Sequence, residues 1–391
     1  MADYKVPGVY VEEPFGLSLS IQTGQTAVPV FAFDAANKFA KAINASSVTA
    51  FSSWLAVSAL RQKAWDDAYK IEKATDAEKK QAVDKKVKAD FDDDLLYQSL
   101  KLYFLNGGGH CYIAPVDKLE ALVPALDDAT LLVQAGAKLD NFKAQVALLC
   151  GVGKTMFALF DSSQNTQLTN ATEVETEQNL YDSTHYAAVY YPWLTVADTS
   201  TVVPPSGAVA GVYARVDRQR GVWKAPANVE IIGATPKFKV SDEVDGACNV
   251  PASGKAINVI RAFRGTGPLI WGARTLASHT GAWRYVPVRR LFNAAERDIR
   301  AAMSMALFEP NSAPTWERVR GAVESYVHGL WQQGALLGDT PAQAYFVQIG
   351  AGVTMTQDDI NNGRMIVKVG LAAVRPAEFI VLQLTQDVVP A

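Results

Sequence analysis

The sequence predicts a mixed α/β (α+β) protein of more than one domain, and three observations support that fold class. Short apolar strands alternate with helix-compatible segments through the middle third of the chain. Two amphipathic helices follow in the last hundred residues. Each chain end carries a strand-like stretch that is set off by proline and has no hairpin partner beside it. We therefore expect a globular core with an extended arm at each end.

Composition and charge exclude several classes of function. The chain has 391 residues, of which 49% are hydrophobic, enough for two or three domains. A formal net charge of −3 gives no field that attracts nucleic acid, so we expect no nucleic-acid partner. The sequence has no secretory pattern and no apolar run of the ~20 residues that span a bilayer. We therefore expect a soluble protein made in the cytoplasm, without membrane insertion.

The stretch "VPGVYVEEP" at the N-terminus predicts an isolated strand. Val9–Glu13 is bounded by Pro7-Gly8 and Pro14. A lone strand leaves its backbone N–H and C=O groups unpaired, so it needs an edge in its own chain or in another. A segment rich in Ser, Thr and Gly then leads to a second strand near Val28–Phe33.

The next elements follow from local patterns. Residues 61–94 are dense in mixed charge and predict a solvated helical hairpin or one long exposed helix. The apolar helix "LLYQSLKLYFL" stops at Gly107–Gly109 and leads into the strand "HCYIAPV". "TLLVQAG", "MFALFDS" and "YAAVYYPWL" predict buried strands of a partly parallel sheet. From Val202 to about Leu276 the pattern predicts mainly loops.

The last hundred residues predict two helices and two strands. The first helix carries an apolar stripe from Phe292 to Ala306, and the second runs from about Pro314 to Gln333 and stops at Gly334. A short helix starts at Thr340-Pro341. The predicted strands are "GRMIVKVGLAAV", in which Met365, Val367 and Val369 share a face, and "EFIVLQLTQDV", in which Ile380, Leu382 and Leu384 share a face. Arg375-Pro376 separates them.

No segment satisfies the requirements of an enzyme or metal site. "CGVGKTM" at Cys150–Met156 suggests a phosphate loop, but Leu148 stands where that loop needs its first glycine, so we expect a turn before a strand. The Asn106–His110 glycines predict a helix stop. The four histidines are scattered without metal-ligand spacing, and the cysteines, Cys111, Cys150 and Cys248, are expected to be reduced. We expect no catalytic residue, no cofactor and no metal.

A basic cluster suggests an interface. Arg215, Arg218, Arg220 and Lys224 lie close together in sequence with Trp223 and prolines, in a stretch predicted to be a loop. Arginines in such a loop suit a partner surface that carries carboxylates. An ordinary solvated loop is the alternative.

Taken together, these segments resemble the contractile tail sheath family, which includes myophage tail sheaths, R-type tailocins and extracellular contractile injection systems. The resemblance begins at "PGVYVEE" and continues through "LKLYFLNGGGHCYIAPV", "PPSGAVAGVYARVDRQRGVWKAPAN", "INVIRAF" and "WGARTL". Its most specific part is "FEPNSAPTWERVRGAVESYVHGLWQQGALLGDTPAQAYFV". Residues 61–94 depart from the family pattern and suggest a decoration.

The resemblance implies four regions. These are an N-terminal linking arm over 1–27, an outer α/β domain over 28–280, an inner domain with a strand-accepting sheet over 281–371, and a C-terminal linking arm over 372–391. Pro14, Gly16, Gly24 and Arg375-Pro376 would act as hinges.

The resemblance also implies which residues join the subunits. Strands donated to neighbours would contain Val9, Tyr10, Val11, Glu12, Ile380, Leu382 and Leu384. The receiving edge would be the strand at Met365–Val369 or that at Tyr345–Ile349, with Phe346, Val347, Met365, Val367 and Val369 in the acceptor sheet. The first choice for contact with an inner tube is the helix bearing Glu317, Arg318, Arg320, Glu324 and His328, and the second choice is the helix bearing Glu296, Arg297 and Arg300.

The implied function is structural. Such a subunit polymerises helically around an inner tube and contracts by rearranging its intersubunit contacts, which drives the tube through a target cell envelope. Its partners would be copies of itself, the tube protein, baseplate and terminator proteins, and possible paralogous sheath subunits. The particle would assemble in the bacterial cytoplasm as part of a virion or a phage tail-like particle. Two alternatives stay open, a tail terminator of the same fold and an NTPase that uses "GVGKT".

Overall fold

A computed structural model describes residues 20–71, 77–278 and 281–378. These residues form two compact units. The first, the central unit, comprises Gly24–Arg297 and returns for residues 373–378. The second, the C-terminal unit, comprises residues 20–23 and Asp298–Ala372. The domain limits expected from the sequence, 28–280 and 281–371, stay a prediction. They describe roles in an assembly, whereas the two units are defined by contacts within one chain.

The central unit is built on a nine-stranded sheet in the order β11-β14-β13-β8-β7-β4-β1-β3-β2. Its inner strands are parallel, which confirms the predicted partly parallel sheet. They are β3 (Cys111–Pro115), β1 (Pro29–Phe33), β4 (Leu131–Val133), β7 (Phe157–Asp161), β8 (Ala187–Tyr191) and β13 (Ile257–Ala262). The edges are antiparallel, with β2 (Thr49–Phe51) on one side and β14 (Pro268–Ile270) and β11 (Val229–Glu230) on the other.

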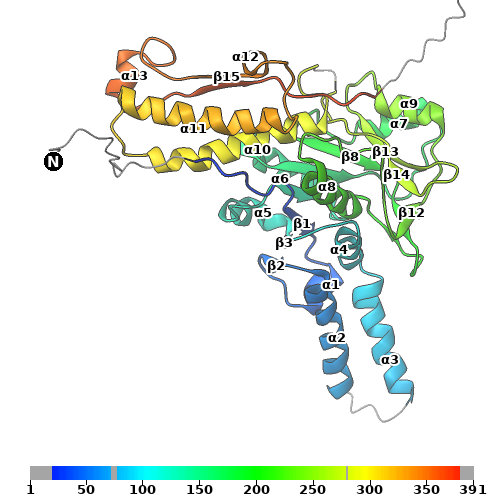
Figure 1. Cartoon of the computed structure of the whole chain (residues 1–391). Coiled ribbons are helices and arrows are strands. Elements are labelled where there is room, and N and C mark those ends of the chain that lie inside the picture. Colours follow the sequence, from blue (N-terminus) through cyan, green and yellow to red (C-terminus); the bar gives the residue numbers. More distant parts are fainter. Residues whose placement is uncertain (1–19, 72–76, 279–280, 379–391) are drawn as a thin grey trace, which may run out of the picture. The chain divides into compact units, whose positions relative to one another are not determined.

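Helices cover both faces of this sheet (Figure 1). Successive strand residues point to opposite faces, so Phe31 packs in one core and Val30 in the other. The first core includes α4 (Leu95–Leu105) and α8 (Ser206–Arg220). The second core includes α5 (Leu119–Leu122), α6 (Leu139–Leu149), α7 (Ala171–Gln178) and α9 (Asp242–Asn249). Strands buried on both faces explain the nearly continuous apolar runs in the sequence.

Smaller elements complete the central unit. A three-stranded sheet contains β10 (Val202–Val203), β9 (Leu194–Val196) and β12 (Ala234–Pro236), and a small hairpin contains β5 (Cys150–Gly151) and β6 (Lys154–Thr155). The short helical segments are α1 (Lys38–Ala42), the π-helical turn η1 (Lys88–Asp92), and the 3-10 turns η2 (Val116–Lys118) and η3 (Val123–Ala125).

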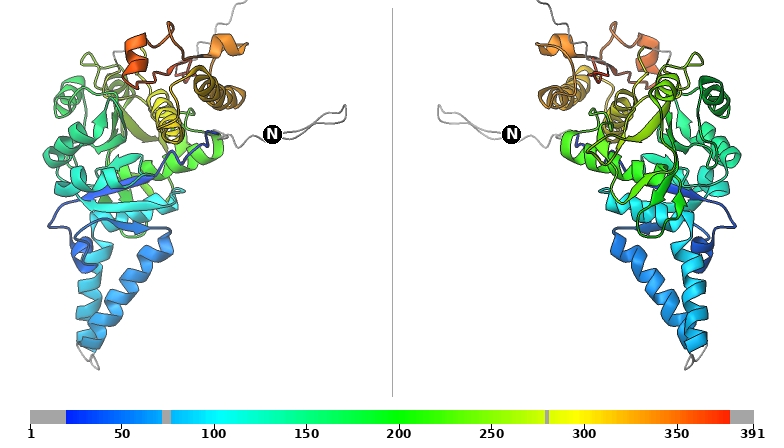
Figure 2. Two further views of the ribbon diagram at one scale, coloured as in Figure 1. Left: turned by 90° about the vertical axis from the view of Figure 1, so that its left-hand side faces the viewer. Right: turned by 90° about the vertical axis from the view of Figure 1, so that its right-hand side faces the viewer.

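The charged segment over 61–94 forms the predicted helical hairpin, which extends away from the sheet of the central unit (Figure 2). Its helices are α2 (Trp54–Ile71) and α3 (Ala77–Val87), so the first begins earlier than predicted. Arg61 donates two hydrogen bonds to Asp92, at 2.9 and 2.7 Å, and Trp65 Nε1 donates to Asp84 at 2.6 Å. These hydrogen bonds thus connect α2 to α3 and η1.

The prediction of loops from Val202 to Leu276 is wrong, because α8 and α9 lie within that stretch. Helix α8 is buried along most of its length, so its sequence lacks the apolar and polar stripes of a surface helix. It lies against α4 at close range. A Cβ atom at Gly207 would lie 2.7 Å from the Ser99 carbonyl oxygen, so only glycine allows this approach.

The C-terminal unit contains the end of the first predicted long helix, the whole of the second and a two-stranded sheet. Helix α10 (Val286–Met303) crosses from the central unit, and the 3-10 turn η4 (Ser304–Ala306) and α11 (Ala313–Gln332) follow. Helix α11 buries Val319, Val323 and Val327, and the chain leaves it through Gly334 at φ +81°. The remaining elements are α12 (Pro341–Ala344), β15 (Tyr345–Gln348), α13 (Gln357–Asn361) and β16 (Lys368–Leu371).

None of the helices in the described ranges combines the length and the apolar character that crossing a membrane requires.

Candidate intersubunit interface

Strands β15 and β16 of the C-terminal unit form an antiparallel pair beside α11 (Figure 1). Tyr345 lies opposite Leu371 and Gln348 opposite Lys368. Within the described residues the sheet consists of these two strands alone. A two-stranded sheet is marginal by itself, and further strands would complete its hydrogen bonding.

One face of this sheet is exposed and carries Phe346 and Gly370 beside the polar pair Gln348 and Lys368. Phe346 is 46% exposed, whereas Tyr345 and Val347 are half-buried. The Phe346 ring lies directly over Gly370 of β16, where a Cβ atom would collide with the ring edge. Glycine at this position therefore lets the aromatic ring lie flat across the sheet.

The predicted acceptor residues occupy this region, with one correction. Phe346 and Val347 lie on β15 and Val369 lies on β16, but Met365 and Val367 precede β16, which starts at Lys368. The expected alternation is present, since Met365 and Val367 are half-buried while Ile366 is exposed. The strand starts late because β15 ends at Gln348, and the Ile366 carbonyl accepts instead from Thr354 Oγ1 at 2.7 Å.

The predicted donor residues lie outside the described residues, so strand donation stays a prediction. They are Val9, Tyr10, Val11, Glu12, Ile380, Leu382 and Leu384. The described end of the N-terminal arm lies in the C-terminal unit. Ser20, Ile21 and Thr23 line a pocket of about 240 Å³ together with α11 residues that include Tyr326 and Leu330.

The five candidate tube-contact residues on α11 divide into two groups. Glu317, Arg318 and Glu324 are exposed and are called here the exposed charges of α11. Arg320 and His328 face the sheet region instead: Arg320 donates to the Ile349 carbonyl at 2.7 Å, and His328 Nδ1 lies 3.1 Å from the Tyr345 hydroxyl. These exposed charges are therefore the candidates on α11 that suit contact with a partner.

The second-choice helix offers fewer exposed charges. Arg300 of α10 is exposed, whereas Glu296 and Arg297 are half-buried. All three take part in contacts within the subunit.

The basic cluster is not a loop, contrary to expectation. Arg215, Arg218 and Arg220 lie on α8, and only Lys224 follows the helix. Arg215 donates to the Glu230 carbonyl at 2.5 Å and Arg218 to the Gly107 carbonyl at 3.0 Å. These two arginines cap carbonyl groups within the subunit, and their role between subunits stays a prediction.

The segment "CGVGKTM" forms a hairpin instead of a phosphate loop. It joins α6 to β7 through β5 and β6, with Gly153 at φ +75° in the turn. A phosphate loop instead follows a strand and opens a helix. The turn that the sequence predicts is confirmed. Among the residues that the structure describes, no group of three or more His, Cys, Asp or Glu side chains could hold a metal ion.

Asp161 is a buried carboxylate that positions α8. Its oxygens accept from the Ser206 backbone N–H at 2.8 Å, from the Ser206 hydroxyl at 3.0 Å and from the Gly136 N–H at 3.0 Å. Burial raises the pKa of Asp161 to about 6, and these hydrogen bonds oppose the rise. Because the donors all belong to the central unit, the carboxylate has a structural role.

Two buried ion pairs escaped the sequence analysis. Arg290 pairs with Asp217, 73 positions away, and Arg274 pairs with Glu378, 104 positions away. The one local sign was an arginine inside a mainly apolar stretch, as in "WGARTL". A buried cation requires a partner, but the sequence gives no means of identifying it.

Comparison with known proteins identifies the family. The family model "Phage tail sheath protein central domain" matches residues 118–276, and "Phage tail sheath C-terminal domain" matches residues 278–387. The sheath of an extracellular contractile injection system, PVC, in its contracted state is 48% identical with a TM-score of 0.82, and the alignment covers 99% of each chain. The contracted helical sheath of the anti-feeding prophage is 37% identical with a TM-score of 0.74, over 98% of this chain and 100% of that one.

A more distant relative is the tail sheath protein of Enterobacteria phage T4. It is 28% identical over 158 residues, which are 39% of this chain and 24% of the T4 protein. The chain thus matches about a quarter of the length of that curated relative. The injection-system sheaths are matched over their full length, with α2 and α3 within the aligned span. The chain belongs to the phage tail sheath protein family.

Proposed function

We propose that this chain is the structural subunit of a contractile sheath that polymerises helically around an inner tube and contracts to drive the tube through a target envelope. The full-length likeness to sheaths solved in the contracted state carries this proposal. A tail terminator of the same fold is not favoured, because the full-length matches include sheaths in the contracted state.

Strand exchange would hold the lattice together. The β15–β16 sheet has a described partner strand on one side only of each strand, and the chain continues beyond Glu378 and before Ser20. Donated strands would add main-chain hydrogen bonds, and their alternating side chains would fix the register. A head-to-tail exchange that does not close gives a helical filament.

Contraction would draw on burial of intersubunit surface, without nucleotide hydrolysis. At ~25 cal/mol per Å² of apolar area, ~400 Å² of additional burial would supply ~10 kcal/mol per subunit before opposing costs. The subunit would then need no catalytic residue and no cofactor. The hairpin at "GVGKT" supports this view, since it does not have the context of a phosphate loop.

The partners would be further copies of the chain, the inner tube, and baseplate and terminator proteins. One solved relative is a baseplate assembly of the anti-feeding prophage, which supports the baseplate context. The exposed charges of α11, Glu317, Arg318 and Glu324, would contact the tube weakly, which suits release during contraction. Assembly would take place in the bacterial cytoplasm, before release of the particle.

Electron microscopy of the purified protein tests this proposal, because a sheath subunit should form long, striated, hollow tubes. Only short rings or caps would favour a terminator. Calorimetry with ATP tests the enzymatic alternative. We expect no binding, and tight binding that Lys154→Ala abolishes would contradict a purely structural role.

A further inference from the structure

Each arm begins beside a residue that a buried arginine of the central unit holds. The residue is Thr26 at the N-terminal side and Glu378 at the C-terminal side. We propose that these two contacts, the N-terminal anchor and the C-terminal anchor, transmit tension from the strand-exchanging arms into the central unit. The inference rests on the proposed function, because it assigns a mechanical role to residues of a sheath subunit.

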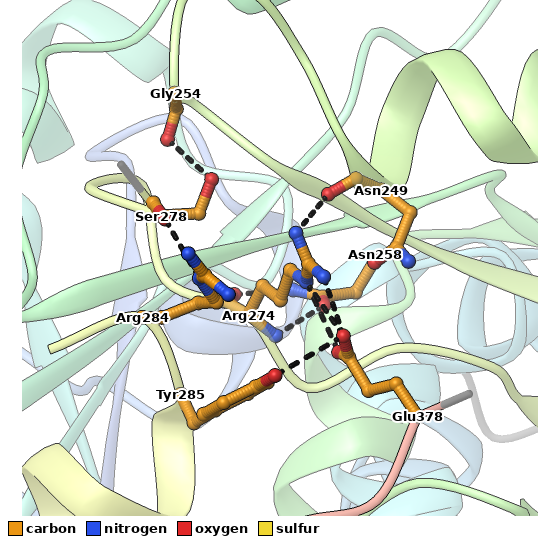
Figure 3. A network of polar contacts seen from close by, with 8 residues as sticks. All are labelled: Asn249, Gly254, Asn258, Arg274, Ser278, Arg284, Tyr285 and Glu378. Atoms are coloured by element: carbon orange, nitrogen blue, oxygen red, sulfur yellow. Dashed lines mark hydrogen bonds and ion pairs between the residues drawn. The ribbon is translucent and has the colours of Figure 1, made fainter. Parts of the chain in front are cut away.

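The C-terminal anchor is a bidentate ion pair (Figure 3). Arg274 Nε lies 3.0 Å from Oε1 and 3.1 Å from Oε2 of Glu378, and Arg274 Nη2 donates to Oε2 at short range. The side chains are 5% and 17% exposed. A guanidinium that binds both oxygens of a carboxylate fixes orientation as well as distance.

Arg274 is itself held from several directions. Its Nη1 donates to the Asn249 carbonyl at 2.8 Å, and its backbone N–H donates to Asn258 Oδ1 at 2.7 Å. Asn258 Nδ2 donates in turn to the Arg274 carbonyl at 2.9 Å, and the Tyr285 hydroxyl donates to Glu378 Oε2 at 3.3 Å. The socket for Glu378 is therefore built from the end of α9, from β13 and from the segment that leads into α10 (Figure 3).

The N-terminal anchor uses different elements. Arg290 of α10 donates to the Thr26 carbonyl at 3.0 Å, and the Thr26 hydroxyl donates to Asp217 of α8 at 2.5 Å. Arg290 also pairs with Asp217, and these two side chains are 3% and 5% exposed. Thr26 is thus held through its backbone and through its side chain.

Because Glu378 is anchored, the part of the C-terminal arm that a neighbouring subunit can pull begins after Glu378 and not at residue 372. The C-terminal unit ends at Ala372, and residues 373–378 belong to the central unit. Arg375-Pro376 therefore lies in the chain after the last residue of the C-terminal unit, Ala372, and before the anchored Glu378. A pull on the chain beyond Glu378 would reach the anchor before it reaches this proline. The central unit would take the load, and the segment at Arg375-Pro376 would allow the C-terminal unit to reorient.

A covalent replacement of the C-terminal anchor tests this role. In the double variant R274C/E378C, a short bismaleimide links the two positions, while the three native cysteines are buried. We expect E378C alone, and the double variant without linker, to form at least tenfold fewer tubes than wild type. The linked double variant should recover wild-type tube formation, with the link inside a single chain. If the contact is merely structural, the linked variant should regain the thermal stability of the wild type without regaining tube formation.

The matched control is R261Q, which removes another arginine that pairs with carboxylates, Asp242 and Asp245, neither of which belongs to an anchor. It should polymerise as wild type does. The double variant stays informative if E378C fails to fold, because it leaves no unpaired buried charge. Three outcomes would contradict the mechanical role of the C-terminal anchor. They are normal tubes from E378C, links that form between chains, and a linked variant that cannot polymerise. Wild-type protein that forms no tubes would instead contradict the proposed function, and the anchor with it.

Discussion

Arg290 and Asp217 form a bidentate ion pair in the interior of the central unit, with Nη1–Oδ1 at 3.0 Å and Nη2–Oδ2 at 2.6 Å. The pair joins α10 to α8, and the guanidinium also lies 4.5 Å from the centre of the Tyr213 ring. Arg290 and Asp217 also each form a hydrogen bond with Thr26, so both helices are joined to the segment that precedes β1.

Replacing one partner of this pair should destabilise the protein strongly. Arg290→Gln leaves Asp217 buried without its cation, which costs about 3–5 kcal/mol in comparable sites. The control Arg364→Gln removes an exposed arginine that pairs with Asp359, and should cost less than about 1 kcal/mol. Denaturant unfolding measures both changes in the free energy of unfolding. Equal effects of the two variants would contradict the structural role of the buried pair.

Asp161 should make stability depend on pH. Its pKa in the folded protein, about 6, is above the ordinary value of 3.8. Its contribution to stability is therefore fully present below about pH 3.8 and is lost as pH rises through 6. Asp161→Asn lacks this titration. We therefore subtract the free energy of unfolding of the variant from that of the wild type. This difference should decrease by about 3 kcal/mol at most as the pH is raised from 4 to 7.5. A difference that is constant with pH would contradict the assignment.

Two glycines of the C-terminal unit should respond to alanine in opposite ways. At Gly370 a Cβ atom would displace the Phe346 ring, so Gly370→Ala should destabilise the unit by about 1 kcal/mol. At Gly329, inside α11, a Cβ atom meets nothing within 4 Å. Gly329→Ala should therefore stabilise the protein by roughly 0.5–1 kcal/mol, because alanine favours helix. Thermal unfolding compares the two, and a stabilised Gly370→Ala would show that the ring is not seated as described.

Reversing one of the exposed charges of α11 should weaken binding to the tube without affecting folding. An exposed ion pair contributes about 0.2–1 kcal/mol, so Glu324→Lys should lower affinity by up to about fivefold for each contact. The loss should shrink in high salt, because ions screen exposed charges. Glu175→Lys, which changes an exposed residue of α7, is the control. Cosedimentation with assembled tube protein measures binding, and equal binding by both variants would remove α11 from the tube interface.

Elements with a one-sided apolar pattern could be predicted from the sequence. Helix α11 buries one stripe and exposes another, so its periodicity was visible, and Gly334 marked its end. The buried parallel strands were visible as apolar runs bounded by polar segments. In both cases the information lies within a short window of sequence.

What the sequence could not reveal depends on contacts over long distances. Helix α8 is surrounded by protein, so its Ala, Gly and Val residues carry no stripe and its arginines resembled a loop. The late start of β16 depends on the bond from Thr354 to the Ile366 carbonyl. The pairs Arg290–Asp217 and Arg274–Glu378 join distant segments, and no local pattern specifies such partners.

The most direct test of the account is the assembly of a variant that lacks Met1–Thr23, observed by electron microscopy beside the wild type. The deletion leaves Thr26 and its anchor in place, so circular dichroism and gel filtration should report a folded monomer. We expect no tubes, because the lattice would lose one of its two exchanged strands. Tubes of normal length and diameter from this variant would contradict strand exchange as the source of cohesion.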